Sequence, residues 1–415
     1  MTLHTAEVVA IGDELIHGAM LDTNSRWLAS ELESAGLSLQ RITVVGDDLA
    51  QLSDAILQAC RRASVVVSTG GLGPTLDDRT REAGAQIAGG PCWFDEVSWL
   101  RIQDYLRGRK RPVPESNRRQ AEFPTGAVVL ANPVGTAPGF LLSAHRAHWF
   151  ALPGVPREMQ RMVQDHVLPW VRTLPSLQPS VQQLLRVIGP SEAMLGERIA
   201  AFMHGGRNPA VGVTVGNGMI TIRITGTAKT VALAQQACEA TAKELRPLLA
   251  TWLLYEGAEE LHALVVQRLI ARQVTLALAE SCTGGLLAGR FTEVAGVSEV
   301  FLGGFVCYAN AAKVRDLAVE PALLAMHGAV SEPVAAAMAT GAAQRTGARL
   351  AIAITGVAGP GGGTPDKPVG TVSFGLSLDG VVQTWTLRMP DLGRSFIRER
   401  SVLEALAAIL RSVQA

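Results

Sequence analysis

The chain has 415 residues, of which 48% are hydrophobic and 18% are charged, with 37 Lys and Arg against 37 Asp and Glu. This composition excludes a long disordered tail or a coiled coil, and the length suggests about two to four domains. A net charge of zero lacks the basic excess on which duplex nucleic-acid binding depends. We therefore expect small-molecule partners and no nucleic acid.

The cysteines and the N-terminus point to a reducing compartment. The five cysteines are far apart and contain no C-x-x-C pair, so neither a disulfide framework nor a thiolate zinc site is indicated. The first residues, MTLHTAEVVAIGDE, lack a basic region followed by an apolar core, and no stretch stays apolar for the length that a bilayer requires. We expect a cytoplasmic protein without a membrane segment.

The first segment alternates short apolar runs with amphipathic ones. It predicts strands at 7–12, 42–46 and 64–71, a helix capped by Asp22 or Thr23, and a helix capped by Asp48. Strand, helix, strand, helix, strand is typical of parallel βαβ units, which bind ligands at the carboxyl ends of their strands.

A glycine-rich string, TGGLGPTLDD (69–78), follows the third of these strands. Its glycines would let the backbone approach an anionic group, and a helix expected from about Leu76 would direct its free amides to the same place. A phosphate would fit there, with Asp77 and Asp78 capping the helix or holding a divalent cation. The string matches neither the P-loop nor G-x-G-x-x-G, and the alternative is a simple turn with Asp caps.

Further polar residues follow the other strands of this segment. They are Gly12, Asp13, Glu14, Asn24, Ser25, Asp47 and Asp48. Each alone is most often a helix cap. Because the carboxyl ends of parallel strands meet at one edge of a sheet, the set predicts an acidic, glycine-lined rim able to hold a metal and a phosphate ester.

The middle of the chain has a different pattern. A hairpin at 140–154 and a helix at 156–171 lead into TLPSLQPS, a linker candidate. Strands are then expected at 184–189, 210–215 and 220–226, and helices from about Ser191 and Lys229. This β-α-β-β-α order predicts a small α+β module.

After a new helix near residue 259, the string LALAESCTGGLLAG (276–289) places three candidate nucleophiles together. Ser281 follows a buried strand and precedes Gly284, so its hydroxyl is expected beside free backbone amides, as in an oxyanion hole. Cys282 is expected to point the other way and to pack. His262 and His327 are the only histidines of this segment and neither lies in an obvious site loop, so another base is needed.

The string GGFVCYANAAKV (303–314) supplies candidate bases. We expect the strand to run to Tyr308, Asn310 to cap the next helix and Lys313 to lie within it. A desolvated lysine can lose its proton near neutral pH and accept one from serine, directly or through the phenol. The alternatives are an ordinary surface lysine and a tyrosine packed at a strand edge.

The string AIAITGVAGPGGGT (351–364) ends a strand at Thr355 and opens into a loop with five glycines. Such a loop could fold around a phosphate or a ribose, and Arg394 and Arg398 at the start of the last helix could bind an anion. The alternatives are a mobile hairpin loop and a solvated helix face.

The strings of the first segment, VVAIGDELIHGAMLDTNSRWLASEL, TGGLGPTLDDRTREA, NPVGTAPGF and LPGVPREM, resemble the molybdopterin-binding-like domain of the competence/damage-inducible protein CinA family. The resemblance covers about the first 170 residues. It implies an ADP-ribose pyrophosphatase activity, known in at least some members, with a divalent metal ion and a monovalent cation such as K⁺. It makes the following residues candidates for holding ADP-ribose or its metal: Glu14, Asn24, Asp47, Thr69, Gly70, Gly71, Gly73, Thr75 and Asp78.

The last segment, through AESCTGG, GGFVCYANAAKV, HGAVSEPV, ITGVAGPGGGT, KPVGTV and GRSFIRER, resembles the nicotinamide-nucleotide amidase domain of the same family. The resemblance implies hydrolysis of nicotinamide mononucleotide to nicotinic acid mononucleotide and ammonia, without cofactor or metal. Ser281 is then the nucleophile, with Tyr308 and Lys313 as its acid/base partners. Candidates for binding the substrate are Thr283, Gly284, Asn310, Thr355, Gly356 and Arg394.

The middle module is similar to the KH-like connector of this family, but it lacks the G-x-x-G clamp and the basic run of a nucleic-acid-binding KH domain, so we expect a structural role.

The predicted fold is α/β: two three-layer α/β domains, 1–172 and 257–415, joined by the α+β module 181–252. The family suggests a homodimer. The leading hypothesis is an enzyme with two activities in pyridine-nucleotide recycling, and the alternative is a non-enzymatic ligand-binding or scaffold protein of competence or DNA-damage responses.

Overall fold

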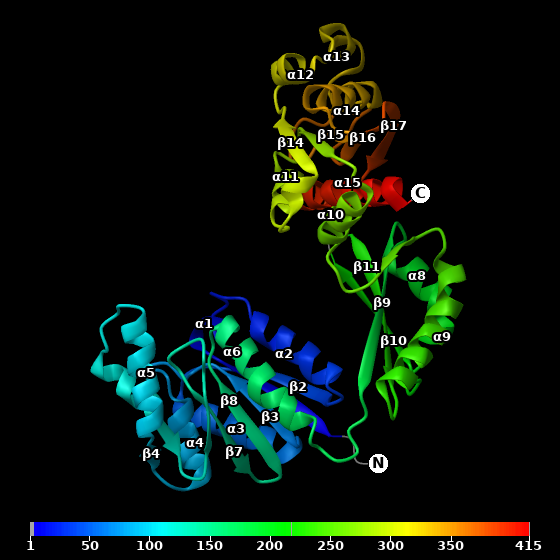
Figure 1. Ribbon diagram of the computed structural model, residues 1–415. Coiled ribbons are helices and arrows are strands. Elements are labelled where there is room, and N and C mark those ends of the chain that lie inside the picture. The colour runs from blue at the N-terminus through cyan, green and yellow to red at the C-terminus, as the bar shows by residue number, and fades with distance from the viewer. Residues whose placement is uncertain (1–3, 217, 415) are drawn as a thin grey trace. The chain divides into compact units, whose positions relative to one another are not determined.

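The computed structural model describes residues 4–216 and 218–414 and contains three main sheets (Figure 1). The first is six-stranded, in the order β2-β1-β3-β8-β7-β6. Its strands are β1 (Thr5–Ile11), β2 (Ser38–Val45), β3 (Val65–Thr69), β6 (Val128–Leu130), β7 (Gly139–Ala144) and β8 (Ala147–Leu152). β2, β1, β3 and β8 are parallel, whereas β7 and β6 add an antiparallel edge.

Helices cover both faces of this sheet because its central strands are apolar on both sides. Val66 packs in a cluster with α3 residues, and its neighbours Val65 and Val67 pack in a second cluster with α2 and α6 residues. The helices are α1 (Asp13–Ile16), α2 (Thr23–Ser34), α3 (Leu49–Arg62), α4 (Thr80–Ala88), α6 (Pro156–Met162), a π-helical stretch Val163–Val167, and α7 (Leu168–Val171). The predicted caps Asp22 and Asp48 are confirmed. The Asp22 carboxylate accepts a hydrogen bond from the Ser25 amide, and the Asp48 carboxylate accepts one from the Gln51 amide, in each case three residues further along the chain.

Between α4 and β6 the chain contains an inserted segment whose helices and strands were not predicted from the sequence. It consists of β4 (Cys92–Phe94), α5 (Glu96–Gly108), the 3₁₀ segment Glu115–Ala121 and β5 (Glu122–Pro124). β4 and β5 pair with each other, and Trp99, Ile102 and Leu106 of α5 form a small core of their own.

The middle sheet has the order β10-β11-β9-β12. Its elements are β9 (Ser180–Ile188), α8 (Glu192–Ile199), the 3₁₀ turn Ala200–Phe202, β10 (Ala210–Gly216), β11 (Met219–Thr227), α9 (Val231–Leu249) and β12 (Leu253–Glu256). The β-α-β-β-α order is confirmed. The strand β12, which pairs with β9, was not predicted. It has only four residues, and in the sequence their apolar pattern could not be told from that of the next helix.

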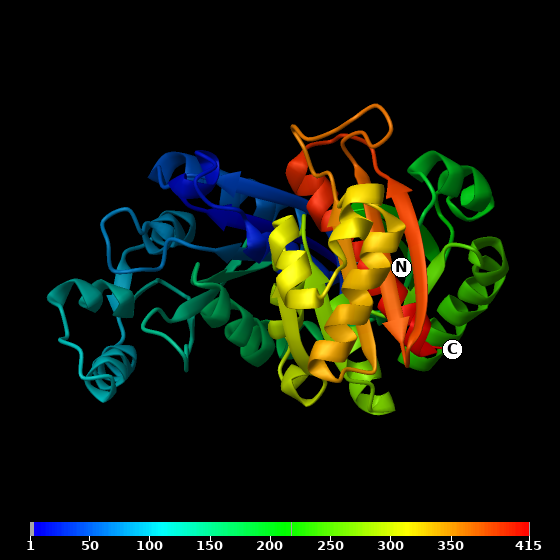
Figure 2. The same ribbon diagram turned by 90° about the horizontal axis from the view of Figure 1, so that it is seen from above.

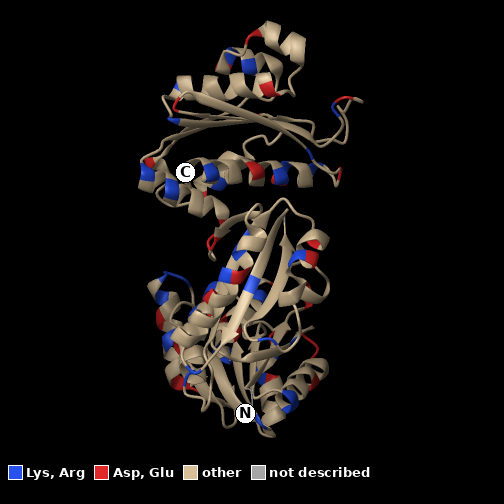
Figure 3. Ribbon diagram, turned by 90° about the vertical axis from the view of Figure 1, so that its right-hand side faces the viewer, with Lys and Arg blue, Asp and Glu red and all other residues tan. Residues whose placement is uncertain are grey.

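The C-terminal sheet has the order β14-β13-β15-β16-β17. Its strands are β13 (Leu276–Glu280), β14 (Phe301–Val306), β15 (Leu350–Gly356), β16 (Thr371–Leu378) and β17 (Val381–Arg388). β13 is parallel to both β14 and β15, whereas β16 and β17 are antiparallel. Among these strands only Glu280 and Arg388 are charged, and Figure 3 shows the charges gathered on helices and loops with both signs interspersed.

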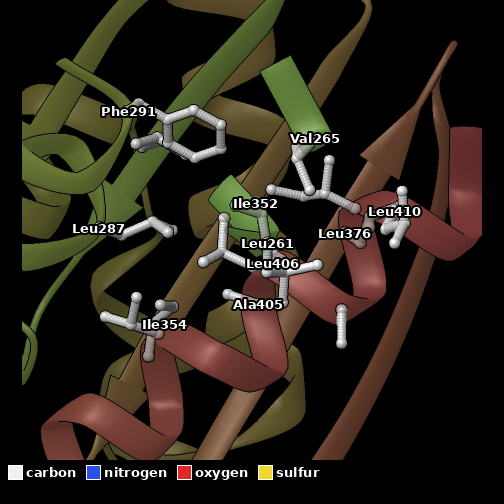
Figure 4. Packing of buried hydrophobic residues seen from close by; sticks show 14 of the residues in the cluster. Leu261, Val265, Leu287, Phe291, Ile352, Ile354, Leu376, Ala405, Leu406 and Leu410 are labelled. Carbon is white, nitrogen blue, oxygen red and sulfur yellow. The ribbon is translucent and has the colours of Figure 1, made fainter. Parts of the chain in front are cut away.

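Helices lie on both faces of this sheet as well (Figures 1 and 2). One face carries α10 (Leu261–Arg272), α11 (Leu286–Thr292) and α15 (Arg394–Gln414); the other carries α12 (Asn310–Leu317), α13 (Pro321–His327) and α14 (Glu332–Thr346), and a 3₁₀ turn, Val297–Glu299, precedes β14. Figure 4 shows Val265 of α10 and Leu406 of α15 beside Ile352 and Leu376 of the sheet. Truncating one such buried leucine to alanine costs about 2–5 kcal/mol.

Side chains of β13 alternate between these two layers. Leu276 and Leu278 pack in the cluster with α10 and α15, whereas Ala277 and Ala279 pack in the cluster with α12 and α14. Because successive side chains of a strand point to opposite faces, Glu280 and the following Ser281 are directed into different layers.

These sheets confirm the predicted fold class, two three-layer α/β domains with a small α+β module between them in the chain. Within the described residues, no helix is both long and apolar enough to cross a lipid bilayer.

Candidate functional site

Ser281 lies at a topological switch point of the C-terminal sheet. β13 is followed by α11 on one face of the sheet, and its neighbour β14 is followed by α12 on the other face. The connections that leave these two strands therefore diverge at their carboxyl ends, which is where the ligand crevice of an open α/β sheet lies. The Ser281 amide donates to the Ile354 carbonyl of β15 (2.9 Å), and the side chain is only 8% exposed. Ser281 is therefore anchored to the sheet.

Lys313 of α12 reaches Ser281 from the neighbouring layer. Its Nζ lies 3.1 Å from Ser281 Oγ, 2.8 Å from the Cys307 carbonyl and 3.3 Å from the Tyr308 carbonyl. Lys313 is 1% exposed and no carboxylate in the described part of the chain pairs with it. Burial consequently lowers the pKa of Lys313 from its ordinary value of 10.5. A neutral amine would donate to the two carbonyls and keep its lone pair for the Ser281 hydroxyl.

The turn after Ser281 leaves backbone donors free. The amides of Cys282 and Thr283 bond no other residue of the described chain, and Gly284 and Gly285 adopt positive φ angles of 61° and 91° that close the turn. Cys282 packs in the same cluster as Leu278, on the layer opposite to Lys313, and burial raises the pKa of its thiol to about 11. The structure therefore favours Ser281 over Cys282 as the nucleophile.

Tyr308 lies at the rim of the site and not against the nucleophile. It is 59% exposed, and its hydroxyl accepts a hydrogen bond from Arg394 (2.9 Å). Within the described chain that hydroxyl bonds neither Ser281 nor Lys313 Nζ, which reaches only the Tyr308 backbone carbonyl. The strand was predicted to run to Tyr308 but ends at Val306. It ends early because the carbonyls of Cys307 and Tyr308 accept hydrogen bonds from Lys313 Nζ and not from a neighbouring strand.

Asn310 is not the cap that the sequence predicted. It is the first residue of α12, exposed, and the cap position is held by Ala309 without a side-chain bond. The helix starts one residue earlier than expected, because its first turn is fixed by amide bonds to the Ala309 carbonyl.

The strand β15 brings two further predicted residues to the same crevice. Thr355 donates its hydroxyl proton to the Ala329 carbonyl (2.8 Å), which leaves its oxygen only as an acceptor. At Gly356 a Cβ atom would lie 3.1 Å from Cys282 Sγ and 2.7 Å from a methyl of Val372, so this position has no room for a side chain. Gly356 thus permits close packing of β15 against the nucleophile turn.

Two arginines of α15 give the crevice a positive charge. Arg394 also donates to the Gly359 carbonyl (2.9 Å) of the glycine-rich loop, and Arg398 donates to the Thr283 carbonyl (2.7 Å). No carboxylate pairs with either arginine within the residues that the structure describes. Two buried polar atoms, Thr283 Oγ1 and Arg398 Nε, have no partner there either. Both can donate a hydrogen bond, so this group of side chains suits an oxygen-rich anion.

The predicted rim of the N-terminal sheet is also assembled at a switch point, since β2 and β3 flank β1. Asn24 Nδ2 donates to Thr69 Oγ1 (3.0 Å) and to the Gly154 carbonyl (2.7 Å), while its Oδ1 is buried without a partner in the described structure. The Gly154 region in turn approaches Gly70 closely. Asn24, Thr69, Gly70 and Gly71 therefore lie together.

Asp78 organises the glycine loop from within. Its Oδ1 accepts from the Gly73 amide (2.7 Å), and its Oδ2 accepts from the Thr75 amide (2.9 Å) and the Thr75 hydroxyl. The helix expected from Leu76 starts only at Thr80, and no side chain caps it. The expectation was wrong because Asp78 bonds backward to the loop, which keeps residues 75–78 in a turn.

A buried cation lies behind this loop. Arg81 donates to the Leu72 carbonyl (2.8 Å), and burial lowers its pKa to about 10. Its Nε has no partner in the described part of the chain, and Arg119 donates to the Thr75 carbonyl from the other side. Arg81 was not among the residues predicted for the site. The sequence indicates it only indirectly, because an arginine there shares the buried side of α4 with Ala83 and Gly84.

The acidic residues of the rim lie close together without forming a metal cage. The Asp13 amide donates to Asp47 (3.0 Å) and the Asp47 amide to Asp13 (3.1 Å). Burial raises the pKa of Asp47, and the charges of Asp13 and Glu14 raise it further. Over residues 4–216 and 218–414, no group of three or more His, Cys, Asp or Glu is arranged to hold a metal ion. These side chains alone do not fit a divalent cation.

Fold and geometry together define a multidomain α/β protein with a serine–lysine pair at the end of one sheet and a glycine-rich loop at the end of another. Three family models match the chain in succession: "Probable molybdopterin binding domain" at 7–173, "Damage-inducible protein CinA KH domain" at 182–253 and "CinA C-terminal domain" at 258–413. The chain belongs to the CinA family, as relatives of similar length also show.

Two of these relatives illustrate the match. A "Putative competence-damage inducible protein" of Clostridium novyi is 37% identical over 410 residues, covering 98% of each chain. A "CinA-like protein" of Gemmatimonas aurantiaca is 40% identical, covering 98% of this chain and 96% of its own. Among solved structures, the competence/damage inducible protein CihA from Agrobacterium tumefaciens is 41% identical, with a TM-score of 0.36, over 38% of this chain and 98% of its own.

Proposed function

We propose that the C-terminal domain is a nicotinamide-nucleotide amidase, which hydrolyses nicotinamide mononucleotide to nicotinic acid mononucleotide and ammonia. The observation that carries the proposal is the 3.1 Å contact between Lys313 Nζ and Ser281 Oγ in a buried setting without a carboxylate partner. A lysine held neutral in this way can replace the histidine of a catalytic triad.

Acylation uses groups that are already in place. Ser281 Oγ attacks the carboxamide carbon while its proton passes to Lys313, and the carbonyl π electrons move to the oxygen. The free amides of Cys282 and Thr283 are the donors nearest to that oxyanion along the chain. Collapse of the tetrahedral intermediate expels the nitrogen, which takes up the proton from Lys313 and leaves as ammonia. Water then attacks the acyl-serine with Lys313 again as the base, and releases the carboxylate.

Tyr308 has a separate part in this proposal. Since its oxygen accepts from Arg394, its own proton is free to be donated. We assign the phenol to relaying the proton from Lys313 to the leaving nitrogen: it donates its own proton and takes up the one that Lys313 received from Ser281. It does not activate Ser281 directly, since no hydrogen bond joins Ser281 to the phenol in the described structure.

The substrate's phosphate and ribose match the polar groups around the turn. Arg394 and Arg398 would bind the phosphate, and the unpartnered Thr283 Oγ1 would bond an oxygen of the ligand. Gly284, Asn310, Thr355 and Gly356 complete the proposed contacts. No cofactor is required by this chemistry.

A second activity, ADP-ribose pyrophosphatase, is proposed for the N-terminal domain on a different observation. The glycine loop is held open by Asp78 with a buried Arg81 behind it, an arrangement suited to a diphosphate. The divalent metal ion and K⁺ implied by the resemblance are part of this proposal, with the substrate's phosphate oxygens needed to complete any coordination. A homodimer in the cytoplasm is likewise proposed.

The decisive experiment is an amidase assay on the whole protein. Purified wild type should release ammonia and nicotinic acid mononucleotide from nicotinamide mononucleotide, and Ser281→Ala should release neither. Full activity of Ser281→Ala would contradict the assignment of the nucleophile. Absence of both ammonia and AMP, the latter tested from ADP-ribose with metal added and withheld, would favour the alternative of a non-enzymatic ligand-binding or scaffold protein.

A further inference from the structure

Glu280, the last residue of β13, is a buried carboxylate that the proposed reaction does not use. It is 1% exposed, and no lysine, arginine or histidine of the described chain forms an ion pair with it. Its side chain is directed to the apolar layer of Leu276 and Leu278. A charge in such a place is costly unless hydrogen bonds compensate it.

Three backbone amides provide that compensation. Glu280 Oε2 accepts from the amides of Gly285 (3.0 Å) and Leu287 (3.1 Å), and Oε1 accepts from the amide of Ala288 (2.8 Å). These amides belong to the first turn of α11, whose N–H groups have no partner within the helix. The carboxylate thus places a negative charge at the positive end of the helix.

The bonds close the nucleophile turn on itself. At its beginning the Ser281 amide is tied to Ile354, and at its end Gly285 is tied back to Glu280, the residue before Ser281. Between these two attachments the amides of Cys282 and Thr283 stay free. Because Glu280 occupies the donors of α11, the substrate's phosphate cannot use them and is left to the arginines of α15.

We infer that Glu280 is a positioning residue for the amidase reaction, an inference that rests on the proposed function. It holds the turn so that Ser281 Oγ stays on Lys313 and the two free amides are preorganised for the oxyanion. Its effect is therefore on the transition state and not on binding of the ground-state substrate.

The test compares Glu280→Gln with wild type in the whole chain. Glutamine keeps the size of the side chain, but its NH₂ group would face an amide donor of α11 in place of an acceptor. We expect kcat for nicotinamide mononucleotide to fall about tenfold or more, with KM changed by less than about twofold. The shorter Glu280→Asp, which keeps the charge, should show a smaller loss of kcat.

Glu7→Gln is the matched control. Glu7 is also a 1% exposed carboxylate at a sheet, where it bonds Arg62 at 2.8 Å in the N-terminal domain. It should lose stability without losing amidase activity. All rates are measured at a temperature at which circular dichroism shows each variant to be folded.

A second readout does not depend on the natural substrate. Diisopropyl fluorophosphate should phosphorylate Ser281: the Oγ–P bond forms, the P–F bond breaks, fluoride leaves and Lys313 takes the proton. We expect the labelling rate to fall about tenfold in Glu280→Gln, because the phosphoryl oxygen uses the same amides. Hydrogen exchange of residues 285–288 should become faster in the same variant.

The outcomes separate this inference from the proposed function. A kcat and a labelling rate within twofold of wild type in Glu280→Gln would overturn the positioning role. So would a raised KM with unchanged kcat, which would place Glu280 in substrate binding. Slower labelling of the variant, combined with no ammonia from the wild type, would leave the positioning role standing and refute the amidase assignment.

Discussion

Lys313 combines almost complete burial with three hydrogen-bond contacts and no counter-charge, and its protonation state governs the proposed chemistry. Since burial lowers its pKa, the active neutral form gains population as the pH rises. We expect kcat/KM to increase with pH, with an apparent pKa below 10.5. Lys313→Arg, which cannot lose its proton, should reduce kcat by about 10²-fold or more. A pH-independent rate would contradict the role of Lys313 as base.

The same pKa shift affects stability in a defined direction. The unfolded chain binds the Lys313 proton up to pH 10.5 and the folded chain releases it earlier, so wild type gains stability as the pH rises through that window. Relative to Lys313→Met, the free energy of unfolding of wild type should increase by up to about 1.4 kcal/mol per pH unit. Urea unfolding of both proteins at several pH values measures the difference, and a difference that stays constant would refute the shift.

Cys282 gives a residue-scale test of which side chain attacks. Its raised pKa of about 11 and its packing against the core leave little thiolate at neutral pH. Cys282→Ala should keep amidase activity within about threefold of wild type, and iodoacetamide at pH 7.5 should leave the folded enzyme active. Loss of activity with either treatment would restore the thiol as a candidate nucleophile.

Among the elements, the loop between β3 and α4 depends most on a single side chain. Asp78 bonds two amides and one hydroxyl of that loop, so Asp78→Ala removes the contacts that hold the Gly73 and Thr75 amides in place. We expect ADP-ribose cleavage to fall about 10²-fold. Asp95→Ala, which removes the cap of α5 at Ser98, is the control: it should cost about 1 kcal/mol of stability and leave cleavage unchanged. Equal cleavage by both variants would show that the loop needs no such support.

Helices and strands could be predicted from the sequence where the interactions that define them join residues close together in the chain. Asp22 and Asp48 cap their helices as predicted, because a cap bonds an amide only three residues away. The start of α4 was mispredicted because Asp78 bonds the amide of Gly73, which precedes it, and not an amide of a following helix. The sequence alone does not indicate which of the two amides an aspartate will bond. β12 and the inserted segment from β4 to β5 were missed because short strands are defined by their partners.

The sequence predicted which residues gather at the site better than it predicted which of their atoms form hydrogen bonds with one another. Ser281 and Lys313 were brought together by strand and helix order, and the structure pairs them. The bond from Arg394 to Tyr308 joins residues 86 positions apart, and the sequence contains no sign of it. Glu280 was overlooked because its partners are backbone amides, which every residue has.

At the scale of the whole molecule, the two proposed sites use different sheets and share no residue, so their losses should be independent. Ser281→Ala should abolish ammonia release and leave ADP-ribose cleavage unchanged. Asp78→Ala should lower ADP-ribose cleavage about 10²-fold and leave ammonia release unchanged. Both activities are assayed on one preparation of each full-length variant. Loss of both activities in either variant would indicate that the domains depend on each other for folding or catalysis.

The alternation of side chains along β13 sets a parity rule for this site. Only positions an even number of residues from Ser281 direct their side chains to the layer of Lys313, and only odd positions direct theirs to the amides of α11. Inserting or deleting one residue in the strand would exchange the two roles, placing a hydroxyl under α11 and a carboxylate on the lysine. The serine and the glutamate therefore have to stay adjacent in the sequence and at the end of β13, because only there does each side chain reach its own partner.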